Sequence, residues 1–278
     1  MVDAVPRHGA RSISLPVAKL LAESKRGTVL ATFARSAYLD LGRSIVAVVA
    51  SELLNGPINV VLADPAPPFD RLAAGGAVTS MPGGLRLEGW PPIDARDAIR
   101  WDPRILRWSA GQLPKVTANL ETLAGRVLAE VPADHLAHPR IERGLALLRS
   151  ALGNRSPTEL AAASSDLAGL GGGLTPTGDD VLVGVLVALA ALPDRSGGEL
   201  ENAIRDGTAG RTTRISEAYL HAAARAEASE AWHRLLTALA GDRRDEVVAA
   251  GRRVLAFGET SGADMLTGFV LAMNTIAR

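Results

Sequence analysis

An eight-residue pattern, Ser or Thr followed by Gly-x-Asp-x-Leu-x-Gly, occurs twice in the chain, from Thr177 to Gly184 and from Ser261 to Gly268. In each copy the aspartate and the last glycine are four residues apart, so they share one face of a helix. A glycine on that face lets two helices approach closely. The repeat therefore predicts two helices that start near Asp180 and Asp264, cross at Gly184 and Gly268, and direct their N-termini at one site.

A glycine-rich stretch precedes the first copy, with glycines at positions 169, 171, 172 and 173. Glycine adopts positive φ and permits close approach of the backbone. The apolar run 181–192 that follows is typical of a buried helix, and Thr177, Asp179 and Asp180 stand where cap and first-turn residues belong. Free N–H groups and the dipole at such a helix start attract anions. We therefore expect a glycine-rich loop that binds a ligand.

Nucleotide-binding motifs do not fit this stretch. A P-loop requires Gly-x4-Gly followed by Lys and Ser or Thr, whereas Gly173-x4-Gly178 continues with two aspartates. The dinucleotide pattern G-x-G-x-x-G fails because Leu174 stands where its third glycine belongs. We expect no nucleotide cofactor.

The periodicity of apolar residues divides the chain into two parts and indicates an α+β protein. Residues 1–112 contain short runs rich in β-branched residues between Gly, Pro, Asn and Asp signals, and predict a mostly β domain, a barrel or a sandwich. In residues 113–278 the period changes from two to about 3.6. This second domain is expected to be mostly helical, with helices over 115–131, 141–152, 157–169, 180–192, 198–207, 213–227, 229–240, 243–257 and 262–277.

Composition excludes several classes of protein. A net charge of zero argues against a partner such as nucleic acid, and the absence of cysteine excludes disulfides and thiol chemistry. The longest apolar run, 181–192, is shorter than the roughly 20 residues that a membrane span needs, and the first residues lack the apolar core of a signal peptide. We expect a cytoplasmic protein with no membrane partner.

Three aspartates, Asp179, Asp180 and Asp264, are the candidate catalytic residues. Together they could form a carboxylate cluster for a divalent cation such as Mg²⁺. The alternative is that each only caps a helix and offsets its dipole. Their repetition beside the glycine-rich loop favours the functional interpretation for Asp180 and Asp264.

Two further segments carry polar groups at expected helix starts. Residues 211–216 offer two arginines and three hydroxyls, which suit a clamp for an anion, although ordinary capping by threonine explains them equally well. Residues 258–262 resemble the first loop, and Glu259 is a candidate base or ligand unless the segment is a plain turn. His135 and His138 lie in a connection, where histidines are mostly solvated, and receive no role.

These motifs carry a family resemblance. The string GLGGGLTPTGDD over 169–180, TTRIS over 212–216 and GETSGAD over 258–264 together resemble the AllH family, which supplies one subunit of oxamate carbamoyltransferase. The resemblance covers residues 169–268.

The resemblance implies a role in allantoin breakdown, in which oxalurate and phosphate give oxamate and carbamoyl phosphate. It implies a small anionic metabolite and other subunits as partners, and we add a homo-oligomer as an expectation. The chemistry suits the residues, because helix N-termini, threonines and arginines can hold small anions. The ligand-binding residues expected are Gly171, Gly172, Gly173, Thr175, Thr177, Gly178, Thr212, Thr213, Arg214, Ser216, Glu259, Thr260, Ser261 and Gly262.

Two other functions remain open at this stage. Aspartates at the helix starts of a helical domain are also typical of the ADP-ribosylglycohydrolases. These enzymes are Mg²⁺-dependent hydrolases that act alone. The chain could instead be a non-catalytic subunit that binds a metabolite or serves assembly while a partner performs the chemistry.

Overall fold

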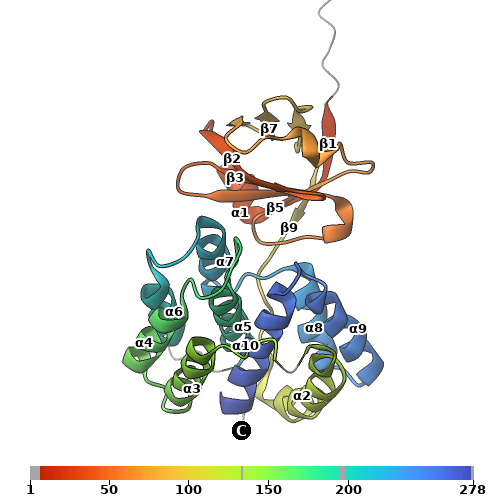
Figure 1. The fold of residues 1–278 in the computed structure, drawn as a ribbon. Helices are drawn as coiled ribbons and strands as arrows, with labels where there is room; N and C mark the ends of the chain where they lie inside the picture. Colours follow the sequence, from red (N-terminus) through yellow and green to blue (C-terminus); the bar gives the residue numbers. More distant parts are fainter. Residues whose placement is uncertain (1–6, 133, 194–197, 277–278) are drawn as a thin grey trace, which may run out of the picture. The chain divides into compact units, whose positions relative to one another are not determined.

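The computed structural model describes residues 7–132, 134–193 and 198–276, and these divide into two compact units between Pro103 and Arg104 (Figure 1). The expected boundary lies at 112/113, somewhat later in the chain. The difference arises because the last strand ends at Trp101 and the segment after it already belongs to the helical unit. Ile105 and Trp108 are buried in the helical core, and the indole Nε1 of Trp108 donates to the carbonyl of Leu236 at 3.0 Å.

The first unit is a closed β-barrel of eight strands with an extra ninth strand, so the expected mostly β domain is a barrel and the α+β class is confirmed. The order around the barrel is β5-β4-β3-β2-β6-β7-β8-β1, β1 pairs back with β5, and β9 adds to β1. Its elements are β1 (His8–Ser14), α1 (Leu15–Leu20), β2 (Arg26–Phe33), β3 (Ser36–Asp40), β4 (Ile45–Val49), β5 (Asn59–Leu62), β6 (Ala77–Met81), β7 (Gly84–Leu87), β8 (Ile93–Asp94) and β9 (Ile99–Trp101), with short 3-10 turns η1 (Ser51–Leu53) and η2 (Phe69–Arg71).

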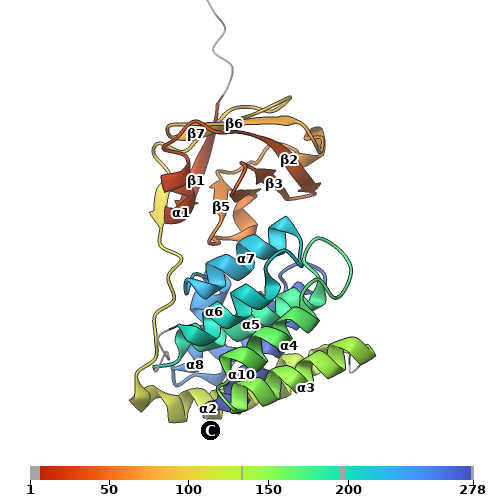
Figure 2. The same cartoon turned by 90° about the vertical axis from the view of Figure 1, so that its left-hand side faces the viewer.

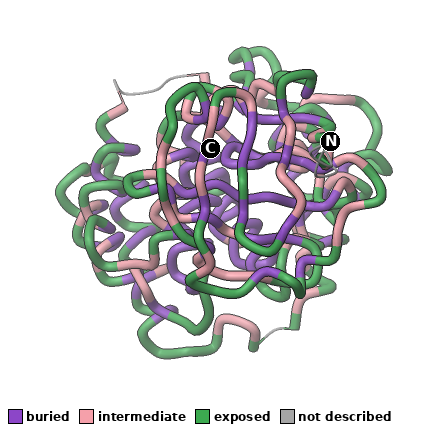
Figure 3. The backbone as a smooth tube through the Cα atoms, turned by 90° about the horizontal axis from the view of Figure 1, so that it is seen from above, coloured by how far each residue is buried: buried purple, intermediate pink, exposed green. Residues whose placement is uncertain are grey.

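Local sequence explains the strands and their turns. Leu85 and Leu87 of β7 are buried while Arg86 between them is exposed, as alternation along a strand requires. The turn from β6 to β7 places Gly83 at a φ of 77°, which suits glycine. In Figure 3 many buried stretches of backbone are interrupted by exposed connections.

The second unit contains all nine predicted helices, with bounds that differ by a few residues (Figure 2). They are α2 (Leu113–Arg126), α3 (Pro139–Gly153), α4 (Pro157–Leu167), α5 (Thr177–Ala191), α6 (Glu199–Thr208), α7 (Arg214–Ala224), α8 (Glu230–Leu239), α9 (Arg244–Leu255) and α10 (Ser261–Ile276), with 3-10 turns η3 (Ala110–Gln112) and η4 (Leu128–Glu130). The capping of α4 is the one expected, because Ser156 accepts from the N–H of Glu159 and Pro157 begins the helix.

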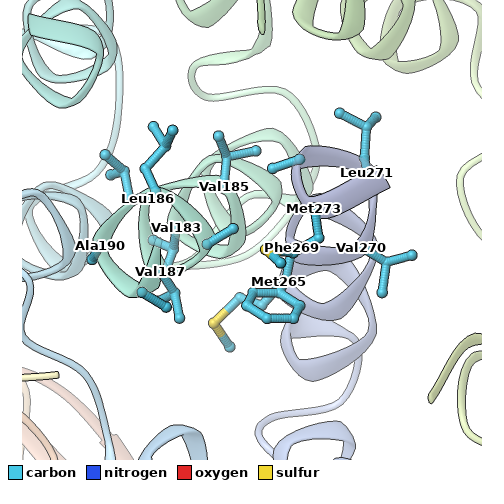
Figure 4. Packing of buried hydrophobic residues seen from close by; sticks show 14 of the residues in the cluster. Val183, Val185, Leu186, Val187, Ala190, Met265, Phe269, Val270, Leu271 and Met273 are labelled. Carbon is cyan, nitrogen blue, oxygen red and sulfur yellow. The ribbon is translucent and has the colours of Figure 1, made fainter. Parts of the chain in front are cut away.

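Helix α5 is the centre of the helical unit. Every residue from Gly178 to Ala191 is buried, which is how a helix that is apolar on all sides has to lie. It packs against α10, α7, α4 and α6. Side chains from α5 and α10, including Val185, Met265 and Phe269, share one core (Figure 4). Across the described residues, no helix is long and apolar enough to cross a membrane.

Candidate functional site

The two repeated motifs meet where α5 crosses α10. A Cβ built on Gly184 would lie 1.9 Å from the carbonyl oxygen of Met265, and one on Gly268 would lie 2.0 Å from that of Val181. Val181 and Met265 hold the same position in the two motifs. The contact is therefore reciprocal, and the predicted crossing at Gly184 and Gly268 is confirmed.

The turns that lead into these helices are also repeated. A Cβ on Gly178 would lie 2.0 Å from the carbonyl oxygen of Leu167, the last residue of α4, and one on Gly262 would lie 2.5 Å from that of Leu255, the last residue of α9. We call α4, loop 168–176 and α5 the first copy, and α9, loop 256–260 and α10 the second copy. In both, a glycine lets the new helix start directly against the end of the preceding one.

Loop 168–176 has a fixed conformation that its neighbours hold. Gly169, Gly171 and Gly173 have φ values of 70°, 115° and 80°, as expected for a glycine-rich loop. Asp179 accepts a hydrogen bond from the N–H of Gly169 at 3.0 Å and another from the hydroxyl of Thr212. Both oxygens of Asp179 are therefore committed to the loop and its support.

Thr212 and Thr213 make hydrogen bonds that hold loop 168–176 and its aspartate in place. The hydroxyl of Thr213 donates to the carbonyl of Leu174 at 2.5 Å and accepts from the N–H of Ser216 at 3.1 Å, so it caps α7. The hydroxyl of Thr212 donates to Asp179, so both threonine hydroxyls have partners within the chain, and an anion clamp at 211–216 stays a prediction. Ser216 is buried and its hydroxyl lowers the pKa of Asp179, whereas Arg214 is exposed.

A hydroxyl pair joins the two copies. The side-chain oxygens of Thr175, at the end of the loop, and Ser261, the first residue of α10, are 2.9 Å apart. Both hydroxyls lower the pKa of the Asp180 carboxyl, so they lie beside it. The glycine-rich loop is thus held against the start of α10 as well as that of α5.

Asp180 lies at this junction with its carboxyl buried. Loss of solvent is the largest cause that raises its pKa, and the charges of Asp264 and Asp179 raise it further, to about 7. The Oδ2 atom of Asp180 has no hydrogen-bond partner among the described residues. Asp180 therefore combines a raised pKa with one buried oxygen that has no hydrogen-bond partner in the described part of the chain.

Asp264 is fully buried at the equivalent position of the second copy, and its partner is a histidine. The Nε2 atom of His135 lies 2.7 Å from Oδ1 of Asp264. Burial raises the pKa of Asp264, while His135 and the hydroxyls of Thr177 and Thr260 lower it. Its Oδ2 atom, like that of Asp180, has no partner within the described ranges.

His135 is the site residue that sequence reasoning missed. It comes from the turn between η4 and α3, and its side chain is 16% exposed rather than fully solvated. No spacing in the sequence links it to Asp264, which lies in the last helix. The expectation that this histidine is solvated is wrong, because the fold places it on a buried carboxylate.

The remaining predicted residues lie at the surface of the same region. Gly171, Gly172 and Gly173 form the exposed tip of the loop, and a Cβ on Gly172 or Gly173 would meet nothing within 4 Å. Glu259 and Thr260 are also exposed, in the turn before α10. Glu259 is thus placed at the solvent side of this turn and not among the buried carboxyls.

The three expected catalytic aspartates face two different parts of the site. Within the part of the chain that the structure describes, there is no group of three or more His, Asp or Glu side chains able to hold a metal ion. The reason is that Asp179 faces the loop, whereas Asp180 and Asp264 face the helix junction. Adjacent helical residues point about 100° apart, which separates Asp179 from Asp180.

The site consists of two repeated helix starts, a glycine-rich loop held by hydrogen bonds, and two buried carboxyls. Each carboxyl has one oxygen without a hydrogen-bond partner in the described ranges. A search of curated proteins gives no match to the chain, and neither does a search of solved structures. Residues 167–273, from the end of α4 into α10, match the model of the family described as oxamate carbamoyltransferase subunit AllH, which confirms the resemblance seen in the sequence motifs.

Proposed function

We propose that the chain is a subunit of an oxamate carbamoyltransferase-type complex and that the junction of α5 and α10 binds a small anion carrying a carbamoyl or amide group. The observation that carries the proposal is the pair of buried carboxyls, Asp180 and Asp264. Each has an oxygen without a hydrogen-bond partner in the described chain, at the start of a helix. Buried polar atoms are nearly always paired, so an unpaired pair at one junction points to a ligand.

The junction of α5 and α10 offers two chemical features that suit such a ligand. Unpaired carboxyl oxygens accept hydrogen bonds from N–H groups, which carbamoyl and amide groups supply. The starts of α5 and α10 offer positive helix ends, which favour a negative charge. Oxamate and oxalurate carry both an N–H group and a carboxylate, whereas phosphate alone carries only the anion.

Asp180 contributes in either protonation state. With its pKa near 7, a neutral carboxylic acid can donate a hydrogen bond to an anionic oxygen, and an ionised one can accept from N–H. Loop 168–176 adjoins the starts of both helices, because it leads into α5 and Thr175 contacts Ser261 of α10. The expected ligand-binding roles of Thr175, Thr177, Ser261 and Gly262 fit this arrangement. Mg²⁺ stays an open prediction, and its two available carboxylates would be Asp180 and Asp264.

Calorimetric titration of the full chain tests the proposal. Oxamate, oxalurate, carbamoyl phosphate, phosphate and ADP-ribose are titrated separately, each with and without Mg²⁺. We expect oxamate or oxalurate to bind, and Asp180→Asn to weaken binding by about tenfold or more, which is the typical value of a hydrogen bond to a charged group. Asp166→Asn, an exposed aspartate on α4, is the matched control and should leave affinity unchanged.

The outcomes separate the three functions. Carbamoyl phosphate formation from oxalurate and phosphate, by the chain together with its partner subunits, supports the transferase. Binding of ADP-ribose and its hydrolysis by the chain alone with Mg²⁺ would replace the proposal with a hydrolase. Binding of oxamate that Asp180→Asn does not alter would reject the junction as the site.

A further inference from the structure

His135 and Asp264 form a dyad at the start of α10. His135 is held in place by its turn, in which its own N–H donates to the carbonyl of Pro132 at 3.0 Å. Its imidazole Nε2 meets Oδ1 of Asp264 at 2.7 Å. The carboxylate is fully buried while the histidine side chain is 16% exposed. The ring therefore connects the buried junction to a partly accessible surface.

With Asp264 ionised, the contact determines which ring nitrogen carries the proton. An ionised carboxylate can only accept, so Nε2 of a neutral His135 donates to Asp264 and Nδ1 keeps its lone pair. Within the described chain, no hydrogen bond of Nδ1 is found. A carboxylate that orients a histidine in this way leaves the opposite nitrogen ready to take up a proton.

The surroundings of the dyad argue for a ligand and not only for a structural contact. The Oδ2 atom of Asp264 has no hydrogen-bond partner among the described residues, and neither has Oδ2 of Asp180 at the start of α5. The two oxygens belong to the starts of the two crossing helices, and His135 contacts the carboxyl that carries one of them. His138, in the same connection, is exposed, in contrast to His135.

We propose that His135, oriented by Asp264, transfers the proton during carbamoyl transfer; the inference rests on the proposed function and adds the residue that performs the acid–base step. In the direction that consumes oxalurate, an oxygen of hydrogen phosphate attacks the carbamoyl carbon, forming a C–O bond. Nδ1 of His135, which faces away from Asp264, takes the proton from that phosphate oxygen, so the phosphate approaches from the partly exposed side of the ring. The C–N bond to the oxamate nitrogen breaks, and the same proton passes from Nδ1 to this nitrogen, giving oxamate and carbamoyl phosphate with no redox change.

The first experiment needs no catalysis. Long-range proton–nitrogen NMR spectra of the histidine rings report the tautomer of His135, and His138 serves as the internal control. We expect the Nε2–H tautomer for His135, lost in Asp264→Asn, and a shift of its Nδ1 signal when oxamate or phosphate is added. An Nδ1–H tautomer, or an unmoved signal under saturating ligand, overturns the inference even if the ligand binds.

The second experiment measures turnover in the assembled complex. His135→Gln is expected to lower kcat by about 100-fold or more, with little change in KM, whereas His138→Gln leaves both unchanged. Added imidazole should restore part of the activity of His135→Ala, which a purely structural role would not allow. Activity of His135→Gln close to that of the unaltered complex overturns the inference.

These results are distinguishable from a failure of the proposed function. If the unaltered complex transfers no carbamoyl group, the proposed function fails, and the NMR spectra alone decide whether an oriented His135 meets small anions. If the complex is active and His135→Gln remains active, the transferase stands and the proton-transfer role is rejected.

Discussion

The first and second copies have one architecture and different chemistry. In both, a helix ends against a glycine, a new helix starts with a hydroxyl residue, and a buried aspartate stands one turn before the glycine of the crossing. The loop of the first copy is longer and contains three glycines at positive φ, whereas Gly258 alone has positive φ in the loop of the second. Asp179 in the first copy corresponds to Ala263 in the second.

The difference shows which residues belong to the frame and which to the site. Gly184 and Gly268 are shared because the crossing requires both. Asp179 occurs once because only the longer loop needs a brace. Asp180 and Asp264 are shared in position and not in partner, since hydroxyls surround the first and His135 contacts the second. The shared residues thus form the helix crossing, and the residues that differ give the two buried aspartates different partners.

The largest effect is expected from adding a methyl group at the crossing. Gly184→Ala places Cβ 1.9 Å from the carbonyl oxygen of Met265, and Gly268→Ala places it 2.0 Å from that of Val181, so the helices must separate. We expect each change to lower the free energy of unfolding of the helical unit by at least about 4 kcal/mol, or to prevent folding. Urea denaturation followed by circular dichroism measures it.

Gly125→Ala is the control for this pair. Gly125 is exposed on α2 and a Cβ there would meet nothing within 4 Å, so alanine should stabilise the helix by about 0.5–1 kcal/mol. If only one of Gly184→Ala and Gly268→Ala destabilises the protein, the crossing is not reciprocal in solution.

The next effect concerns pH and the first-copy carboxyl. Because the folded-state pKa of Asp180 is about 7 and its unfolded value is near 3.9, its contribution to stability is full below pH 4 and is lost as pH rises to 7. Asp180→Asn cannot ionise. Relative to wild type it should therefore gain stability between pH 4 and pH 7, by on the order of 4 kcal/mol.

Thermal unfolding at a series of pH values measures this difference. Asp179 and Asp264 have pKa values raised in the same direction and contribute slopes of the same sign in both proteins. The difference between the two proteins therefore reports the titration of Asp180 together with its charge coupling to these two carboxyls. A difference between the two proteins that does not change over this range would show that Asp180 titrates as an ordinary carboxyl.

A smaller effect should follow from removing the brace that only the first copy has. Asp179→Ala leaves the N–H of Gly169 and the hydroxyl of Thr212 without their acceptor, which should cost about 2 kcal/mol. Hydrogen exchange should accelerate in loop 168–176 and stay unchanged in loop 256–260. Asp166→Ala on the exposed side of α4 is the control, and equal costs for the two changes would contradict the bracing role.

Much of this arrangement could be predicted from local sequence. The helices followed from a 3.6-residue period, and the crossing followed from the repeated aspartate and glycine because helix geometry fixes which residues share a face. The choice between barrel and sandwich could not be made, since it depends on the pairing of β1 with β5, whose residues are distant in the chain.

The site was predictable only where it coincides with the repeat. Aligning the copies pairs Asp180 with Asp264 and sets Asp179 apart, which is a signal that Asp179 has a different role. Nothing of this kind marks His135, because it reaches Asp264 through tertiary packing from a turn without periodicity. Thr212 and Thr213 are residue types expected in an anion clamp. Only the fold shows that their hydroxyls donate to Asp179 and to the carbonyl of Leu174.

The smallest effect should come from the hydroxyl pair that joins the copies. The oxygens of Thr175 and Ser261 are 2.9 Å apart, and both hydroxyls lie beside Asp180. In a double-mutant cycle, Thr175→Val and Ser261→Ala should each cost about 1 kcal/mol, and the double mutant should cost less than their sum by about 0.5–1 kcal/mol. Repeating the cycle with oxamate bound tests whether the ligand contacts both copies. A ligand held between the copies adds its own contacts to the same two hydroxyls, so the coupling should change, whereas a ligand held by one copy leaves it as it was.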